Sequence, residues 1–390
     1  MAAALSNLDV NSKRVLIRVD FNTPLDDHGE VGSDARIREA LPTIRWVLDH
    51  GGRPILMSHL GRPKGRVVEA MRLRPAARRL QKLLGMPVRY ANDCIGEEAA
   101  TAAAALQQGE CLLLENLRFH PEETKGDPEF ARQLASLADV YVNDAFGTAH
   151  RAHASVVGVP QYLPSAAGLL LAKEIRAFEH LVTRPAAPVV VILGGAKVSD
   201  KLPLILHLLP RVDAILIGGA MAYTFLKQQG IGIGSSLCED SLLAEAGTVL
   251  AAAKKNDVEL LLPVDHVCAA ELKADSQPSV HGPEIPDDLM GLDIGRATIE
   301  SYRTVIVRAK TIVWNGPMGV FELPAFRQGT AAIAHAVAAA DAWSLVGGGD
   351  SVAAVELLGV TASIDHVSTG GGAGLELLEG KTLPGIAALG

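Results

Sequence analysis

The amino-acid sequence predicts an α/β protein made of two doubly wound parallel-sheet (Rossmann-like) domains joined by a hinge helix. With 390 residues, the chain is too long for one ordinary hydrophobic core, and about two domains of ~150–200 residues are expected. Short apolar stretches alternate with Ala- and Leu-rich helical segments, a pattern typical of parallel sheets covered by helices on both faces. The apolar stretches are too numerous for one sheet of this kind.

The predicted elements follow in chain order. Strands are expected at residues 14–19, 53–58, 111–115, 139–143, 188–193, 214–218, 259–264, 311–314, 343–347 and 364–368. Helices are expected between them at 74–84, 128–138, 240–254 and 329–339. A longer helix is expected at 164–182, and the proline-containing segment 183–188 breaks the pattern after it. We therefore expect one domain over residues 1–172 and a second over 173–370.

Composition excludes several classes of protein. The chain is 48% hydrophobic and 21% charged, as globular proteins are, and it carries a net charge of −8 with no long run of Lys and Arg, so no nucleic-acid partner is expected. Its four cysteines, Cys94, Cys111, Cys238 and Cys268, form no C-x-x-C pair, which excludes a dense disulfide scaffold and a zinc ribbon. Without a signal peptide or an apolar run of ~20 residues, we expect a cytoplasmic protein with no membrane partner.

In the first half, polar side chains follow the predicted strands, where ligands bind in open α/β sheets. Arginines gather near these ends, and several arginines in one crevice would bind a small polyanion, because each guanidinium offers paired donors. They are Arg18, Arg36, Arg62, Arg118 and Arg151, with His59, His150 and His153 nearby. The alternative is that the arginines pair with surface acids, since residues 1–180 hold as many Asp and Glu as Lys and Arg.

The spacing of His150 and His153 leaves two interpretations open. A metal site needs a third ligand, and none stands at a plausible spacing. The favoured interpretation is an imidazole in a polar or anionic site.

In the second half, glycine-rich turns follow the predicted strands and predict a nucleotide site. Glycine turns let backbone N–H groups approach phosphates. Gly194 to Lys201 adds two lysines that would share a helix face if Lys197 opened a helix. Gly348-Gly349-Asp350-Ser351 adds a carboxylate for Mg²⁺ and a hydroxyl. A Walker A loop is absent, because five residues separate Gly374 from Gly380 where that motif has four.

No catalytic base is evident, and a carboxylate acceptor would explain why. A carboxylate with a pKa near ~4 is already ionised at neutral pH and needs no deprotonation. Catalysis would then consist of neutralising charge on a moving phosphoryl group and holding both oxygens in line.

The sequence resembles the phosphoglycerate kinase family over essentially its whole length. Segments that resemble family motifs are 18–24, 58–65, 115–120, 144–154, 194–201, 314–322, 347–351 and 368–373, in family order. The resemblance implies Mg²⁺-dependent, reversible phosphoryl transfer from 1,3-bisphosphoglycerate to ADP, giving 3-phosphoglycerate and ATP in glycolysis. It also implies a monomer whose C-terminal tail, 371–390, packs on the first domain.

Site residues are likewise implied by this resemblance. The phosphoglycerate would be held by Asp20, Phe21, Asn22, Arg36, His59, Leu60, Gly61, Arg62, Arg118 and Arg151. The nucleotide would be held by Lys201, Gly218, Gly219, Leu292, Asn315, Glu322, Gly348, Gly349, Asp350 and Ser351, with Asp350 reaching Mg²⁺. The catalytic groups would be Arg36, Lys197, Lys201, Gly371 and Gly372.

Two departures from the family pattern lie near the expected adenine site. Ala220 stands where a third glycine is frequent, and Arg296 stands where proline is common. They bear on the tightness and base preference of nucleotide binding.

We expect the two domains to close by a hinge around 164–188 and 368–373. The alternative function is a non-catalytic two-domain anion- or nucleotide-binding protein; a dehydrogenase would need a G-x-G-x-x-G that no first-half strand carries.

Overall fold

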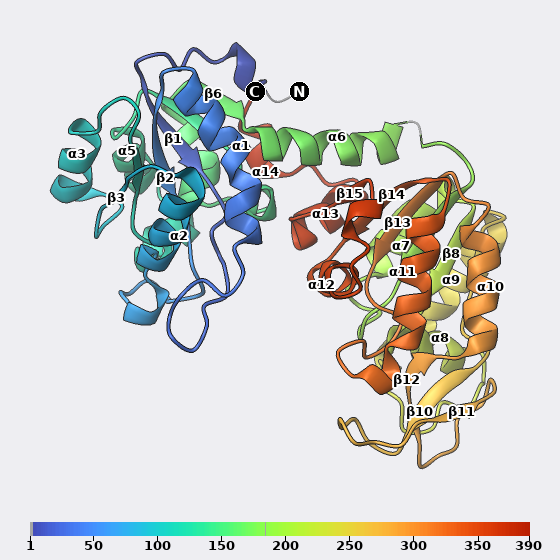
Figure 1. The fold of residues 1–390 in the computed structure, drawn as a ribbon. Coiled ribbons are helices and arrows are strands. Elements are labelled where there is room, and N and C mark those ends of the chain that lie inside the picture. The colour runs from blue at the N-terminus through green and yellow to red at the C-terminus, as the bar shows by residue number, and fades with distance from the viewer. Residues whose placement is uncertain (1–2, 184) are drawn as a thin grey trace. The chain divides into compact units, whose positions relative to one another are not determined.

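The computed structural model describes residues 3–183 and 185–390, and the chain divides into two compact units (Figure 1). The first unit comprises residues 1–176 and 382–390, and the second comprises 177–381. The change of unit falls inside helix α6 (Leu169–Thr183). The chain returns to the first unit at Thr382 and not at 371, because α13 (Gly371–Leu378) packs in the second unit, where Gly374 lies against the Phe178 ring.

The first unit is built on a parallel sheet in the order β3-β4-β2-β1-β5-β6. Its strands are β1 (Arg14–Arg18), β2 (Arg53–Met57), β3 (Val88–Tyr90), β4 (Cys111–Leu113), β5 (Val140–Asn143) and β6 (Ser165–Ala167). Its helices are α1 (Ala35–Asp49), α2 (Arg74–Leu84), α3 (Gly96–Ala104), α4 (Pro121–Lys125), α5 (Pro128–Ala135) and α14 (Pro384–Ala387). Ile17, Val142 and Leu56 of the central strands pack with Ile44 and Leu80 of α1 and α2 in one core.

The second unit contains a parallel sheet in the order β15-β14-β13-β7-β8-β9. Its strands are β7 (Val189–Leu193), β8 (Ala214–Ile217), β9 (Glu259–Leu261), β13 (Thr311–Asn315), β14 (Trp343–Gly347) and β15 (His366–Val367). Its helices are α7 (Leu202–Leu208), α8 (Met221–Gln228), α9 (Leu243–Lys255), α10 (Arg296–Ile306), α11 (Gln328–Ala339), α12 (Gly349–Leu357) and α13. Ile192, Trp314 and Val346 of three adjacent strands are buried in its core.

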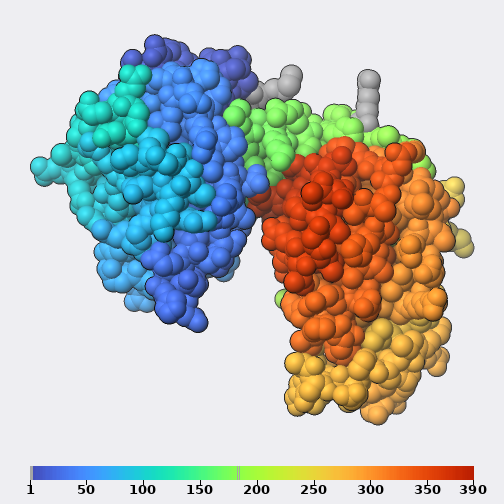
Figure 2. All heavy atoms as spheres, in the orientation of Figure 1, coloured from blue at the N-terminus to red at the C-terminus, as the bar shows by residue number. Residues whose placement is uncertain are grey.

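A small antiparallel sheet completes the second unit. It consists of β10 (His266–Ala269), β11 (Ser279–His281) and β12 (Met290–Ile294), in the order β11-β10-β12. Within this unit it lies at the end opposite β15 and α13 (Figures 1 and 2, gold).

The predicted fold class is confirmed, with two six-stranded parallel sheets and helices. All ten predicted strands are present, and the sequence reasoning missed β3, β6, β10, β11 and β12, which are short or belong to the antiparallel sheet. The helix expected at 164–182 begins only at Leu169, because Ser165–Ala167 pairs with β5 as an edge strand. Among the described residues, no helix is long and apolar enough to cross a membrane.

Candidate active site

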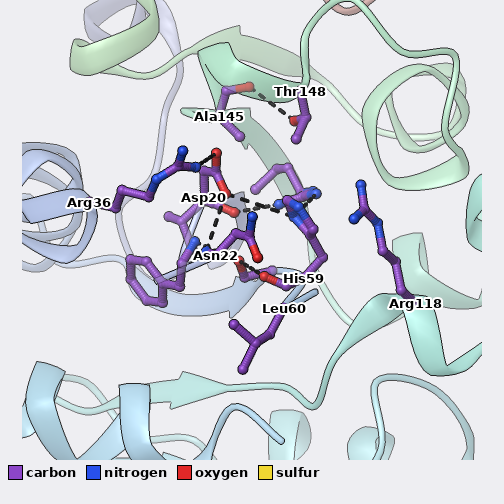
Figure 3. Close-up of polar contacts among 12 residues, drawn as sticks. Asp20, Asn22, Arg36, His59, Leu60, Arg118, Ala145 and Thr148 are labelled. Atoms are coloured by element: carbon purple, nitrogen blue, oxygen red, sulfur yellow. Dashed lines mark hydrogen bonds and ion pairs between the residues drawn. The ribbon is translucent and has the colours of Figure 1, made fainter. Parts of the chain in front are cut away.

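The first unit gathers charged side chains at the carboxyl ends of β1 and β2 (Figure 3). Arg18 ends β1 and is fully buried, while Asp20 and Asn22 follow it in the loop and His59 follows β2. Because β1 and β2 are parallel neighbours, these two loops leave the sheet at the same edge. Arg36 reaches the loop from the first turn of α1 and forms an ion pair with Asp20.

Hydrogen bonds between the loops fix this edge. The Phe21 amide donates to Ser58 Oγ at 2.8 Å, and the Gly61 amide donates to Asn22 Oδ1 at 2.8 Å. The buried Asn116 side chain donates to the Leu60 carbonyl at 2.8 Å. These contacts hold the loop after β2 against its neighbours before any ligand binds.

Positive charge in this cluster exceeds the acid that faces it. Arg118 is buried, donates to the Gly61 carbonyl at 2.7 Å, and keeps an Nε with no hydrogen-bond partner. Burial, followed by the charges of Arg151 and Arg18, lowers its pKa to about 10. Burial and then Arg18 lower the pKa of His59 well below 6.5, so its imidazole is neutral at pH 7. A dianionic ligand would relieve this crowding of cations.

Arg18 is positioned by a buried group that the sequence reasoning missed. Its Nε donates to Ser155 Oγ at 2.9 Å, and that hydroxyl donates to Glu123 Oε1 at 2.7 Å. The Ser155 amide donates to the other carboxylate oxygen at 3.0 Å. Glu123 has no exposed surface, and contacts with His153, Ser155 and Arg18 outweigh burial and lower its pKa. Nothing in the local sequence marks Glu123 as buried, because its neighbours in α4 are polar.

The remaining predicted residues of this unit differ in their contacts. Arg62 is exposed, and no ion pair or hydrogen bond of its side chain is found within residues 3–183 and 185–390. Arg151 Nε lies 3.2 Å from His150 Nε2. His153 Nδ1 lies 3.5 Å from Glu123 Oε1, so this imidazole lies beside a buried carboxylate. In the described part of the chain, neither histidine belongs to a three-ligand metal cluster.

The second unit contains a cavity of about 290 Å³ where its predicted glycine turns meet. Lys197 and Lys201 line it together with Asp200 and Asn315. Glycines are the most frequent residues in the rest of the lining, which consists of Gly194, Gly195, Ala196, Gly316, Gly348, Gly349, Asp350, Ser351, Gly371, Gly372 and Leu375. A wall of glycines exposes peptide N–H groups, which suits phosphate oxygens.

Close backbone approach explains the glycines at the centre of this wall. A Cβ at position 194 would lie 2.0 Å from the Pro317 carbonyl oxygen. A Cβ at position 316 would lie 2.1 Å from the Gly194 carbonyl oxygen, and Gly316 has a φ of +102°. Neither position accepts a side chain without moving backbone, so the turns after β7 and β13 pack directly on each other.

The two lysines reach the cavity from a loop. Residues 194–201 form turns, and α7 begins at Leu202, so Lys197 opens no helix. Lys201 is 9% exposed and its Nζ donates to Asn315 Oδ1; burial lowers its pKa. Lys197 is exposed. The Ser351 hydroxyl is buried and accepts a hydrogen bond from the Gly316 amide at 2.5 Å.

Other predicted nucleotide residues lie outside this lining. Gly219 lies beside it, since a Cβ there would be 2.5 Å from the Gly195 nitrogen, and Gly218 packs against Met318. Leu292 is in β12, in an apolar cluster with Ala269 and Phe326. Glu322 is exposed.

The two departures from the family pattern have different surroundings. Ala220 packs against the cluster around Tyr223 and is the residue before α8. Arg296 is exposed at the first position of α10, where proline is also well accommodated.

An arginine-rich cluster on one α/β unit and a lysine-bearing cavity with glycine turns on another are the features expected of a small-molecule phosphotransferase. The model of one family, described as phosphoglycerate kinase, matches residues 5–381. The chain therefore belongs to the phosphoglycerate kinase family.

Individual relatives agree with this assignment. The chain is 59% identical over 386 residues to a phosphoglycerate kinase of Moorella thermoacetica, covering 99% of this chain and 98% of the relative. It is 54% identical over 398 residues to that of Gloeobacter violaceus, covering 99% and 98%. The structure of phosphoglycerate kinase from Coxiella burnetii matches with a TM-score of 0.90 and 42% identity, covering 100% of this chain and 99% of that one. The enzyme from Pyrococcus horikoshii matches with a TM-score of 0.85 and 34% identity, covering 99% and 98%.

Proposed function

We propose that this chain catalyses reversible phosphoryl transfer between 1,3-bisphosphoglycerate and ADP, giving 3-phosphoglycerate and ATP in glycolysis. The observation that carries the proposal is the unbalanced cation cluster around Arg118 in the first unit, combined with the glycine-walled cavity in the second. A non-catalytic anion- or nucleotide-binding protein would account for either site alone. It would not account for both within this family.

The first unit would hold the phosphoglycerate. Arg118, Arg151 and Arg62 offer guanidinium donors to its phosphate, and the neutral His59 donates without adding charge. Asp20 and Asn22 would accept from or orient the hydroxyl and carboxyl end. Arg36 and Arg18 are held by Asp20 and Ser155, so their donors are fixed before substrate arrives.

The second unit would hold the nucleotide. Lys201, held by Asn315, and the glycine N–H groups around Gly348 would bind the phosphates. Lys197, exposed on the cavity wall, would follow the phosphoryl group that moves. The turn at Gly218 and Gly219, with Leu292 and Glu322, would border the nucleoside.

The donors around the cavity fit Mg²⁺. Asp350 is an exposed carboxylate in the first turn of α12, on the cavity wall. Mg²⁺ in nucleotide sites usually takes one or two carboxylates and completes its shell with phosphate oxygens and water. Asp350 would be that carboxylate, and the bound ion would withdraw charge from the phosphates. Removing divalent metal with EDTA should abolish turnover, and MgCl₂ should restore it.

The chemical step needs no general base. A carboxylate oxygen of 3-phosphoglycerate attacks the γ-phosphorus of ATP, and the bond from that phosphorus to the β-bridging oxygen breaks. Its electron pair stays on ADP, and no proton moves. Arg36, Lys197 and the backbone N–H groups at Gly371 and Gly372 would balance charge on the phosphoryl group in flight.

Because the two substrates would bind different units, transfer requires the units to close. We place the hinge in 164–188, which contains the helix where the unit changes, and in 368–373, which lies within the second unit. Closure would also exclude water from the acyl phosphate. Small-angle scattering with both substrates bound tests this: an unchanged radius of gyration would count against closure. We further propose a cytoplasmic monomer, which fractionation and light scattering would check.

The deciding experiment measures ADP release from Mg·ATP with and without 3-phosphoglycerate, while a coupling enzyme removes the acyl phosphate. Turnover that requires both substrates supports the proposed reaction. A folded protein that binds nucleotide and phosphoglycerate without turnover would instead be the non-catalytic binding protein.

A further inference from the structure

A cluster of three metal-ligand side chains lies outside both sites, in the first unit. Asp93, Cys94 and His120 each offer one ligand atom, and these atoms all lie within 4.8 Å of one another. They come from two segments, the turn before α3 and the residue after the 3₁₀ turn 117–119. Among the described residues of the chain, this is the one such cluster of three.

The spacing of these atoms is close to what a tetrahedral ion needs. Zn²⁺ binds thiolate, imidazole and carboxylate at about 2.0–2.3 Å, which puts its ligand atoms about 3.3–3.5 Å apart. His120 Nε2 now lies 2.7 Å from Asp93 Oδ1, as an ion pair. Reaching the tetrahedral spacing requires this pair to open by about 0.6 Å and the Cys94 Sγ, which lies within 4.8 Å of both atoms, to move closer by at most about 1.3 Å.

Access and surrounding charge also favour a cation. The Asp93 side chain is 46% exposed and that of His120 is 26% exposed, so an ion can enter from solvent, while Cys94 closes the inner side. Nearby carboxylates add negative charge, since Glu123 and Glu115 act on the Cys94 thiol and Glu122 acts on the His120 imidazole, while Glu115 also pairs with Arg72.

The Asp93–His120 ion pair alone leaves the cysteine unexplained. The ion pair needs only the side chains of Asp93 and His120, and Cys94 contributes only its backbone amide, which donates a hydrogen bond to Asp93 Oδ1 at 2.6 Å. The Cys94 Sγ lies within 4.8 Å of a ligand atom on each of them, which the packing of a buried thiol does not by itself require. Sulfur, nitrogen and oxygen together select a borderline or soft cation and disfavour Mg²⁺.

We propose that Asp93, Cys94 and His120 form a binding site for a thiophilic divalent cation of the Zn²⁺ class, with water as the fourth ligand. Binding would release the thiol proton of Cys94 and the Nε2 proton of His120 to solvent, and metal bonds would replace the Asp93–His120 hydrogen bond. It would also connect the segment before α3 to the loop that carries Arg118, two residues from His120. The site is separate from the Mg²⁺ proposed at Asp350.

The test titrates the metal-free, full-length protein with Zn²⁺ in competition with a chromophoric chelator, and with Co²⁺ as a spectroscopic probe. We expect one high-affinity equivalent, a thiolate-to-cobalt charge-transfer band, and no displacement by millimolar Mg²⁺. Cys94→Ser should remove the band and weaken Zn²⁺ binding on the order of 10²-fold. Cys238→Ser is the matched control, since Cys238 has an acidic neighbour, Asp240, but belongs to no such cluster, and it should change nothing.

His120→Gln gives a second variant if Cys94→Ser fails to fold. It should weaken Zn²⁺ binding while keeping a thiolate band at high Co²⁺. Zn²⁺ binding that is absent in the wild-type protein, or that survives both substitutions unchanged, would overturn the proposal.

Discussion

The substitution Gly371→Ala separates the proposed phosphate-binding role of the second unit from its stability. Gly371 opens α13 and lines the cavity. A Cβ there would meet the Gly348 Cα at 3.6 Å and the Gly349 nitrogen at 3.8 Å, which are ordinary van der Waals contacts. The methyl group therefore fits the free protein but occupies space between two turns that we propose bind phosphate.

The expected effects on stability and turnover have opposite signs. Alanine is favoured over glycine in a helix by up to ~1 kcal/mol, so the free energy of unfolding should stay the same or rise. Turnover should fall, because displacing a reacting group by about 1 Å can cost on the order of 10²-fold in rate. We expect kcat/KM for Mg·ATP to fall by about that factor, with kcat carrying most of it.

The assay is the coupled ADP-release measurement, combined with urea denaturation of the same preparations. Gly282→Ala is the matched control, since it adds a methyl to the same unit where no atom lies within 4 Å of the new Cβ. It should leave both quantities unchanged. A Gly371→Ala enzyme that folds normally and keeps kcat/KM within twofold of wild type would refute the assignment of this wall to the transferring phosphate.

Three other predictions concern the first unit. Arg118→Ala should raise KM for 3-phosphoglycerate roughly 10- to 100-fold through loss of charge-assisted hydrogen bonds, whereas Arg132→Ala, an exposed arginine paired with Glu129, should leave steady-state kinetics unaltered. Burial raises the pKa of Asp144 from 3.8 to about 7, so its contribution to stability is complete below pH 3.8 and is lost as the pH rises through 7. As the pH rises from 5 to 7, the free energy of unfolding of Asp144→Asn should therefore rise by about 3 kcal/mol relative to that of the wild-type protein, as measured by urea denaturation. A difference in unfolding free energy that stays constant over this pH range would contradict this. Burial lowers the pKa of His59 well below 6.5, so the free energy of unfolding of the wild-type protein should fall as the pH drops below 6.5. His59→Gln should remove up to ~1.4 kcal/mol of that loss per pH unit. Equal slopes of unfolding free energy against pH in the two proteins would argue against a buried neutral imidazole.

The sequence was most informative where parallel strands end. Each polar segment that follows a predicted strand leaves the sheet at the same edge as its neighbours, so Asp20 and His59 could be expected to meet without knowledge of the side-chain contacts. For the same reason, the glycine turns at Gly194 and Gly348 could be expected to meet, and both line the cavity of the second unit. The edge strand Ser165–Ala167 could not be foreseen, because its three small residues carry no period and pair only through tertiary contact.

The buried polar groups that position Arg18 could not be predicted from the sequence. Glu123 lies in a short helix of polar residues, and only the folded chain brings Ser155 and Arg18 to it. Leu292 and Glu322 entered through the family resemblance alone, and both lie outside the lining of the cavity. A residue that acts through packing or through another side chain leaves no spacing signal.

The two proposed sites differ in the groups that would bind the anion. In the first unit the proposed anion site is lined by guanidinium groups, and burial followed by the charges of Arg151 and Arg18 lowers the pKa of Arg118. In the second unit the cavity is lined largely by glycines. The carboxylates of Asp200 and Asp350 act on the ammonium group of Lys201 and offset part of its positive charge. Peptide N–H groups bind a phosphate oxygen without a net charge, and their hold changes little whether the phosphoryl group is on ADP or on the acyl oxygen. Because only interactions that strengthen in the transition state speed the transfer, the charges of Arg36 and Lys197 would supply the part of the rate enhancement that these N–H groups do not.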